Sequence, residues 1–276
     1  MCRLYGFIAS EPTKVECTLV HSQNALMSQS RSDLGGYSHS HGWGVATFGG
    51  DGPDVERQAW AAYHGEHFER AAARAYATLV LAHVRRATVG GTDLHNTHPF
   101  VEGRWTFTHN GTVPGFAQMR DEMAARLSPK HRDAIKGVTD SEHVFRLFLT
   151  RADEGAIDPH GDMVAALRAL ACEVTELAET AAPGKPLGLN MMITDGERLF
   201  GTRINRGLCF VDRLGVYDCE ICGFPHIHHD PKRDYRAIVV ASEPLTHEAW
   251  TDIPNHSIWE ANLTTGLHIY PLLMSG

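Results

Sequence analysis

The chain has 276 residues, a formal net charge of −8 and a hydrophobic fraction of 43%, which is typical of a globular protein large enough to bury a full core. The acidic balance argues against general binding to nucleic acid or anionic membranes, because both favour a basic surface. No apolar run approaches the ~18 residues of a membrane span, the start lacks a secretion signal, and the six scattered cysteines suggest no disulfide framework. We therefore expect a cytoplasmic protein that acts on a small polar molecule.

The first residues carry the most specific chemical signal. A small side chain at Cys2 allows an aminopeptidase to remove Met1, which would leave Cys2 with a free α-amine. That amine titrates near pH 8 and the thiol about half a unit higher, so the amine can take the thiol proton. The alternative is that Cys2 has no catalytic role and that a small residue at position 2 only suits translation or processing. The apolar run at residues 4–10 predicts a strand that holds Cys2 at the mouth of a sheet.

The first half of the chain alternates predicted strands with polar loops. We expect a loop at residues 28–41, a strand at 42–48, a turn at 49–53, a helix at 66–78 and a buried strand at 79–85. Residues 85–111 are rich in glycine, histidine and other polar residues. We interpret this segment as a loop that carries function on a rigid scaffold.

Helical patterns follow, and then strands again. Phe116, Met119, Met123 and Leu127 recur at helical spacing, residues 139–142 fit a capping box, and residues 163–177 form the clearest amphipathic helix. Apolar runs predict strands at 187–194, 198–204, 208–211 and 235–241, with a hairpin turn at Asp195-Gly196. Strands, helices and strands in this order, without a linker, favour one layered domain.

Seven short strings in a fixed order point to a family. They are MCRLYGF at the start, HGWGVATF at 41–48, HVRRATVGG at 83–91, NTHPF at 96–100, HNG at 109–111, TDSE at 139–142 and VASEPL at 240–245. Together they resemble the class II glutamine amidotransferases of the N-terminal nucleophile hydrolase superfamily. The spacing is most similar to stand-alone members such as the γ-glutamyl hydrolase of ergothioneine biosynthesis. The resemblance implies an α+β fold, a four-layer αββα sandwich, as a single domain over residues 2–276 with Met1 removed.

The resemblance also implies roles for individual residues. Cys2 matches the nucleophile, which forms a γ-glutamyl thioester that water then cleaves. Arg85 matches the arginine that binds the substrate α-carboxylate, and the alternative is a surface charge, which is how we interpret Arg86. Asp140 matches the acid that pairs with the substrate α-ammonium, but an aspartate at a helix start also interacts with exposed backbone N–H groups.

Further matches concern the oxyanion and the shape of the pocket. Asn110 and Gly111 match the oxyanion hole, although Asn-Gly is also a common hairpin turn. His98 matches a histidine that shapes the pocket, and Thr88 adds a hydroxyl contact to the carboxylate. Val89 and Arg86 depart from the larger family members, which often carry histidine and tryptophan at these positions. These differences suggest a γ-glutamyl amide other than glutamine.

The resulting hypothesis is a cysteine amidohydrolase that needs no cofactor and cleaves the γ-amide of glutamine or of an N-substituted γ-glutamyl compound. We expect no second domain that would accept ammonia. Two alternatives remain. The protein could supply ammonia to a separate synthase, or it could bind a γ-glutamyl metabolite without catalysis. A homodimer is a further possibility.

One cluster lies outside these strings. Cys219 and Cys222 are followed by His226, His228 and His229, at spacings that a zinc ion could use. Against a metal, the segment has the composition of an exposed turn, and 18 histidines in the chain make a chance cluster common. We assign no catalytic metal, and a metal at Cys219, Cys222, His226 and His228 stays an open alternative.

Overall fold

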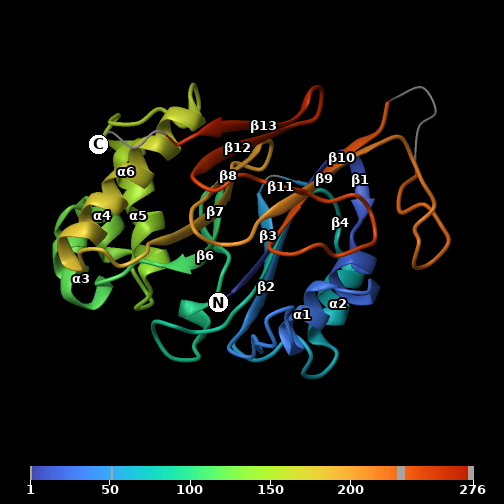
Figure 1. Ribbon diagram of the computed structural model, residues 1–276, viewed down its shortest axis with the longest axis horizontal. Helices are drawn as coiled ribbons and strands as arrows, with labels where there is room; N and C mark the ends of the chain where they lie inside the picture. The colour runs from blue at the N-terminus through green and yellow to red at the C-terminus, as the bar shows by residue number, and fades with distance from the viewer. Residues whose placement is uncertain (1, 51, 229–233, 273–276) are drawn as a thin grey trace.

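Two antiparallel sheets lie face to face in the computed structural model, with helices on both outer faces (Figure 1). The structure describes residues 2–50, 52–228 and 234–272. Within these residues no helix is long and apolar enough to cross a membrane. The predicted four-layer αββα sandwich is thus confirmed.

Within the described residues, the first sheet contains seven strands in the order β11-β9-β10-β1-β4-β2-β3. They are β1 (Arg3–Lys14), β2 (Trp43–Phe48), β3 (Pro53–Gln58), β4 (Tyr76–Val84), β9 (Cys209–Leu214), β10 (Arg236–Ala241) and β11 (Thr251–Asp252). The second sheet has the order β13-β12-β8-β7-β6-β5. It consists of β5 (Phe100–Glu102), β6 (Trp105–Thr112), β7 (Gly188–Thr194), β8 (Leu199–Arg203), β12 (Ser257–Asn262) and β13 (Gly266–Pro271).

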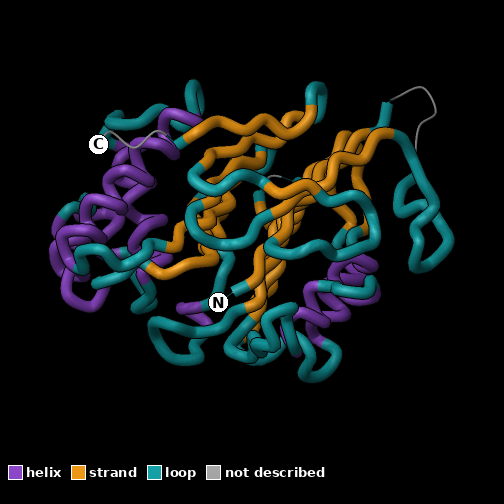
Figure 2. The backbone as a smooth tube through the Cα atoms, viewed as in Figure 1, coloured by secondary structure: helices purple, strands orange, loops and turns teal. Residues whose placement is uncertain are grey.

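The helices form the two outer layers (Figure 2). On the first sheet lie the π-helical turn η1 (Cys17–His21), α1 (Leu26–Arg31) and α2 (His67–Arg74). On the second sheet lie α3 (Phe116–Ala125), α4 (Pro129–Asp133), α5 (Asp140–Asp153) and α6 (Met163–Ala181). A 3-10 turn, η2 (Leu94–Asn96), lies in the segment between β4 and β5.

Strand β1 shows why its apolar run is continuous. Tyr5 and Phe7 pack with the outer helices, whereas Leu4 and Ile8 pack in the cluster between the sheets. Both faces of the strand are therefore buried, and alternation gives way to an unbroken apolar stretch. Gly6 allows the sheets to approach, because a Cβ there would lie 2.9 Å from the Met192 sulfur.

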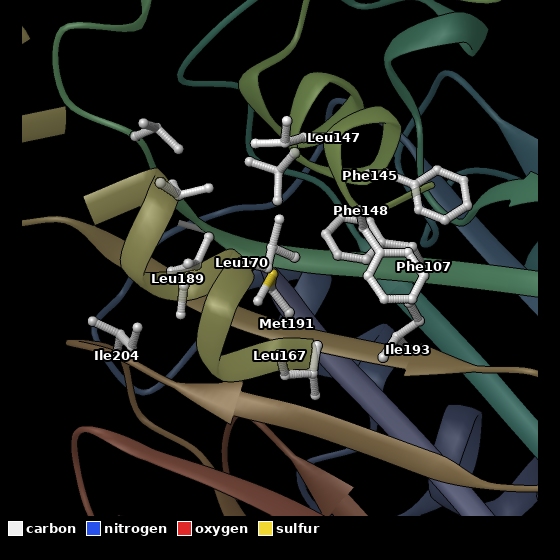
Figure 3. Close-up of a cluster of buried hydrophobic side chains, with 14 of the residues drawn as sticks. Phe107, Phe145, Leu147, Phe148, Leu167, Leu170, Leu189, Met191, Ile193 and Ile204 are labelled. Atoms are coloured by element: carbon white, nitrogen blue, oxygen red, sulfur yellow. The ribbon is translucent and has the colours of Figure 1, made fainter. Parts of the chain in front are cut away.

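Three buried clusters join the four layers. The cluster between the second sheet and its helices contains stacked aromatic rings of Phe107 and Phe145, 5.3 Å apart, together with leucines of α6 (Figure 3). Burial of a side chain of this size contributes roughly 1.5–3 kcal/mol. Strand β6 belongs to this layer on one face and lies against β1 and β4 on the other.

Most predicted elements are found, with three corrections. Residues 28–31 belong to α1 and not to a loop, and residues 76–78 begin β4 and do not continue α2. The segment 85–111 is not a loop throughout, because it contains η2, β5 and most of β6, and Asn110-Gly111 therefore lies inside a strand and is not a turn. Tyr76, the first residue of β4, has an exposed side chain and does not extend the buried face of α2.

Candidate active site

Cys2 lies where three strands of the first sheet begin or end. Strand β1 runs antiparallel to β4 and β10, with Arg3 opposite Val84 and Tyr5 opposite Ala241. The residues before β1 therefore meet those after β4 and β10. The Cys2 sulfur lies 3.6 Å from the carbonyl oxygen of Arg86. Burial raises the pKa of the Cys2 thiol, so the thiol is protonated at neutral pH and needs a base to become a nucleophile.

A buried ionic network fixes the start of β1. The Arg3 guanidinium donates to the Cys2 carbonyl oxygen at 3.0 Å and forms ion pairs with Asp33 and, at 2.6 Å, with Glu243. Asp33 also accepts a hydrogen bond from the buried His39 ring at 2.9 Å. Each charge in this network has a partner, which limits the cost of burying it. The Cys2 carbonyl oxygen is consequently held by a side chain that is itself fixed by two ion pairs.

Arg85 is buried at the end of β4, with 3% of its surface exposed. Its guanidinium donates to the carbonyl oxygens of Val89 at 2.8 Å and Gly91 at 2.9 Å. Among the described residues no carboxylate forms an ion pair with it, and burial lowers its pKa. The alternative of a surface charge is therefore wrong. Arg86 is only half-buried and lies over the ring of Tyr37 at 4.1 Å.

Asp140 begins α5, directly after the helix cap. The Thr139 hydroxyl accepts from the backbone N–H of Glu142 at 3.2 Å, as the capping pattern predicts. One Asp140 oxygen accepts from the N–H of Ser141 at 2.9 Å, and the other from the N–H of Val113 at 2.8 Å. Asp140 thus binds backbone N–H groups, as the alternative to substrate binding predicts, and this contact links α5 to the end of β6.

Asn110 approaches the first sheet from the second. Its side-chain nitrogen lies 3.4 Å from the hydroxyl of Ser242, which also accepts from the N–H of Leu4 at 2.9 Å. The Asn110 oxygen is buried without a hydrogen-bond partner in the described part of the chain. Gly111 has no room for a side chain, because a Cβ would lie 1.9 Å from the carbonyl oxygen of Gly188. The Asn110 side chain therefore makes only one long hydrogen bond, to Ser242, within the described residues.

Thr88 and His98 have different surroundings. Thr88 is exposed, and its hydroxyl lies 3.3 Å from that of Thr112 at the end of β6. His98 is buried, with ring centroids 4.2 Å from His83 and 4.6 Å from Phe100. Burial holds the pKa of His98 well below its ordinary value, so the ring is neutral. Its ring contacts are with aromatic neighbours, and its role in the pocket stays a prediction.

Arg206 is a further cation at this edge that sequence reasoning missed. In the β6–β7 pairing Thr112 lies opposite Gly188 and Asn110 opposite Asn190. A Cβ on Gly188 would lie 2.9 Å from Nε of Arg206. Opposite residues share a face of the sheet, so the Arg206 guanidinium covers the face that carries Asn110. Its Nε is buried without a partner among the described residues, and burial lowers its pKa.

Sequence reasoning also missed Ser242, Glu243 and His109, which hold backbone or side-chain groups of the site in place. Ser242 and Glu243 lie in the VASEPL string, which offered a signal, whereas Arg206 stands in no recognisable string. His109 joins β6 to α5, because its ring contacts the Ser141 hydroxyl at 2.8 Å and donates to the Gly188 carbonyl oxygen at 3.0 Å.

The metal candidates of the sequence lie outside this site. Cys219, Cys222 and His226 belong to the segment between β9 and β10, with the Cys222 sulfur 3.2 Å from the His226 ring nitrogen. His228 does not join them: it packs against the ring of Tyr76, with centroids 6.4 Å apart. His228 thus stands apart from the other three predicted ligands. His229 lies outside the described residues.

Comparisons with known proteins show which family and fold the chain shares. The family model for class II glutamine amidotransferases matches residues 1–263. The chain is 28% identical to the "Probable glutamine amidotransferase DUG3" of Saccharomyces cerevisiae, over 99% of this chain and 85% of that protein. It is 25% identical to the gamma-glutamyl-hercynylcysteine sulfoxide hydrolase of Mycobacterium tuberculosis, over 94% and 92%. A glutamine aminotransferase class-II domain protein from Silicibacter pomeroyi shares the fold, with a TM-score of 0.65, 20% identity and coverage of 99% and 100%.

Proposed function

The chain belongs to the class II glutamine amidotransferases, and from this membership we propose that it hydrolyses the γ-amide of glutamine or an N-substituted γ-glutamyl compound through a thioester on Cys2. Amide hydrolysis is the activity class that the family and the relatives share. One observation carries the proposal: the Cys2 sulfur lies 3.6 Å from the carbonyl oxygen of Arg86, next in the chain to the buried Arg85, which has no carboxylate partner among the described residues. The sulfur is near a cation that can orient a free α-carboxylate.

The first half of the reaction forms the thioester. Once Met1 is removed, the α-amine of Cys2 takes the thiol proton, and the sulfur attacks the γ-carbonyl carbon of the substrate. The Asn110 amide and the Gly111 N–H donate to the oxyanion that develops on the carbonyl oxygen. The ammonium of Cys2 then protonates the leaving nitrogen, and the C–N bond breaks.

The second half returns the enzyme to its starting state. The α-amine accepts a proton from water while the hydroxide oxygen attacks the thioester carbon, and the C–S bond breaks. The thiolate regains the proton, and glutamate leaves. Throughout, Arg85 binds the α-carboxylate, Asp140 the α-ammonium, and Thr88 adds a hydroxyl contact. His98 shapes the pocket without transferring a proton.

Arg206 supports a leaving group that carries a negative charge. Its guanidinium covers the same face of β6 as Asn110, and no carboxylate among the described residues pairs with it. A γ-glutamyl amide of an amino acid has a carboxylate next to the cleaved nitrogen, whereas glutamine releases only ammonia. We expect Arg206→Ala to lower kcat/KM for a γ-glutamyl amino acid by roughly tenfold or more, the scale of one charge-assisted hydrogen bond. The rate with glutamine should change little.

Glutamate release from glutamine and from γ-glutamyl amino acids tests the proposal. The Cys2→Ala variant should release no glutamate, whereas Cys172→Ala, a control on α6, should match the wild type. Turnover by Cys2→Ala would refute the mechanism. Release that depends on an added synthase would favour the ammonia-supplying alternative, and binding without release would favour the non-catalytic one.

A further inference from the structure

Four metal-binding side chains gather between two distant parts of the sequence. Cys219, Cys222 and His226 come from the segment between β9 and β10, in orange at the right edge of Figure 1, and Cys17 comes from η1. Their sulfur and ring-nitrogen atoms all lie within 4.8 Å of one another. Around a tetrahedral zinc ion with Zn–S bonds of about 2.3 Å, ligand atoms lie roughly 3.8 Å apart. One ion can therefore reach all four atoms with small adjustments.

The backbone around Cys219 and Cys222 is shaped for this arrangement. The N–H of Ile221 donates to the Cys219 sulfur at 3.4 Å, and the N–H of Gly223 donates to the Cys219 carbonyl oxygen at 2.9 Å. Gly223 has φ +74°, which favours glycine. A tight turn thus directs both sulfurs to the same side and gives one of them an N–H donor, the kind of outer contact that tunes a metal-bound thiolate.

His226 and Cys17 are held from the first sheet. The N–H of Lys14, the last residue of β1, donates to the carbonyl oxygen of His226 at 2.9 Å. Cys17 follows three residues later and is buried, with 7% of its surface exposed. The backbone contact therefore brings the histidine to the buried thiol, and the cluster does not depend on the loop alone.

Three thiols and one imidazole are a ligand set that zinc favours in structural sites. A disulfide would use two of the cysteines and leave the third thiol and the histidine without a function. We propose that the segment between β9 and β10 is attached to the outer layer of the first sheet by one structural Zn²⁺ ion, bound by Cys17, Cys219, Cys222 and His226.

The ion has a structural role because it lies far from Cys2. Cys2 precedes β1 and Cys17 follows it, and at about 3.3 Å per residue a strand of this length spans roughly 35–40 Å. Four protein ligands also leave no open position for a substrate. The ion fixes the end of β1 and the segment after β9, and it takes no part in the reaction.

Metal analysis of the full-length protein, purified without chelator and equilibrated with zinc, tests the inference. We expect about one zinc per chain, falling below about a tenth in Cys222→Ser and in Cys17→Ser. The controls His228→Ala and Cys172→Ser should keep the zinc. Removal of the metal with a chelator should lower the melting temperature of the wild type and not that of Cys222→Ser.

Cobalt binding by the wild type supplies a readout that needs no variant. We expect the visible bands of tetrahedral Co²⁺ and a sulfur-to-metal charge-transfer band that corresponds to three thiolates. Absence of zinc after equilibration, full zinc in Cys17→Ser, or loss of zinc in His228→Ala would overturn the ligand set. None of these measurements uses a substrate, so their outcome does not depend on whether the proposed reaction is correct.

Discussion

At the scale of single residues, some side chains of the site are hydrogen-bonded to the protein backbone, and others have almost no hydrogen bonds within the protein. Arg85 donates to two backbone carbonyls and Asp140 accepts from two backbone N–H groups. Replacing either residue would disturb the fold as well as any bound substrate. Asn110 makes one long contact to Ser242. It is therefore the residue at which catalysis and stability separate most cleanly.

We expect Asn110→Ala to lower kcat by roughly 10²–10³-fold, the usual cost of losing one oxyanion donor. The melting temperature should change little. Asn190→Ala is the matched control: the Asn190 side chain bonds the backbone of Ile204, Arg206 and Gly207, so its loss should lower the melting temperature. Steady-state kinetics and thermal unfolding of both variants check this. An Asn110→Ala protein with wild-type kcat would contradict the assignment of the oxyanion hole.

At the scale of elements, the start of α5 links stability to the site. Thr139 caps the helix, and the next residue, Asp140, reaches back to the N–H of Val113. The second half of the predicted capping box differs, because Glu142 accepts from the N–H groups of Lys136 and Gly137. The cap and the loop before it are thus fixed by separate side chains.

Removal of this cap should be measurable. We expect Thr139→Ala to lower the free energy of unfolding by about 1 kcal/mol and to raise KM, because Asp140 loses its fixed position. Thr139→Ser keeps the hydroxyl, so its free energy of unfolding and its KM should stay close to those of the wild type. Urea unfolding and kinetics of the two variants provide the measurement. Equal stability of Thr139→Ala and the wild type would show that the cap is not needed.

At the scale of the whole molecule, the sequence predicts the layers better than the site. Unbroken apolar runs such as residues 4–10 predicted strands because both faces of a central strand are buried. The Asn110-Gly111 pair does not turn, because β6 stays paired with β7 through it, with Asn110 opposite Asn190 and Gly111 opposite Leu189. Arg206 and Cys17 could not be assigned, since their partners lie far away in the sequence and no local pattern marks them.

The buried network around β1 makes the whole fold sensitive to acid. Burial lowers the pKa of His39 to about 4, although its contact with Asp33 opposes this. The folded form prefers neutral His39, so its contribution to stability is complete above pH ~6.5 and is lost as the pH falls towards 4. A shift of this size corresponds to roughly 3 kcal/mol at about 1.4 kcal/mol per pH unit.

His39→Gln keeps a donor for Asp33 but cannot titrate. We expect its free energy of unfolding to depend less on pH between about 6.5 and 4 than that of the wild type. His83 and His98, whose pKa values burial also lowers, remain in both proteins, so the difference between the two isolates His39. Chemical unfolding at several pH values gives the comparison. Parallel curves would mean that His39 does not carry this dependence.

The most direct test of the central claim is the intact mass of the purified protein before and after treatment with a diazo-ketone analogue of glutamine, with peptide mapping of the adduct. The proposed mechanism predicts a chain that lacks Met1 and gains one adduct, on Cys2. A chain that keeps Met1 and gains no adduct, or one that is modified at another cysteine while Cys2 stays free, would contradict an N-terminal cysteine nucleophile.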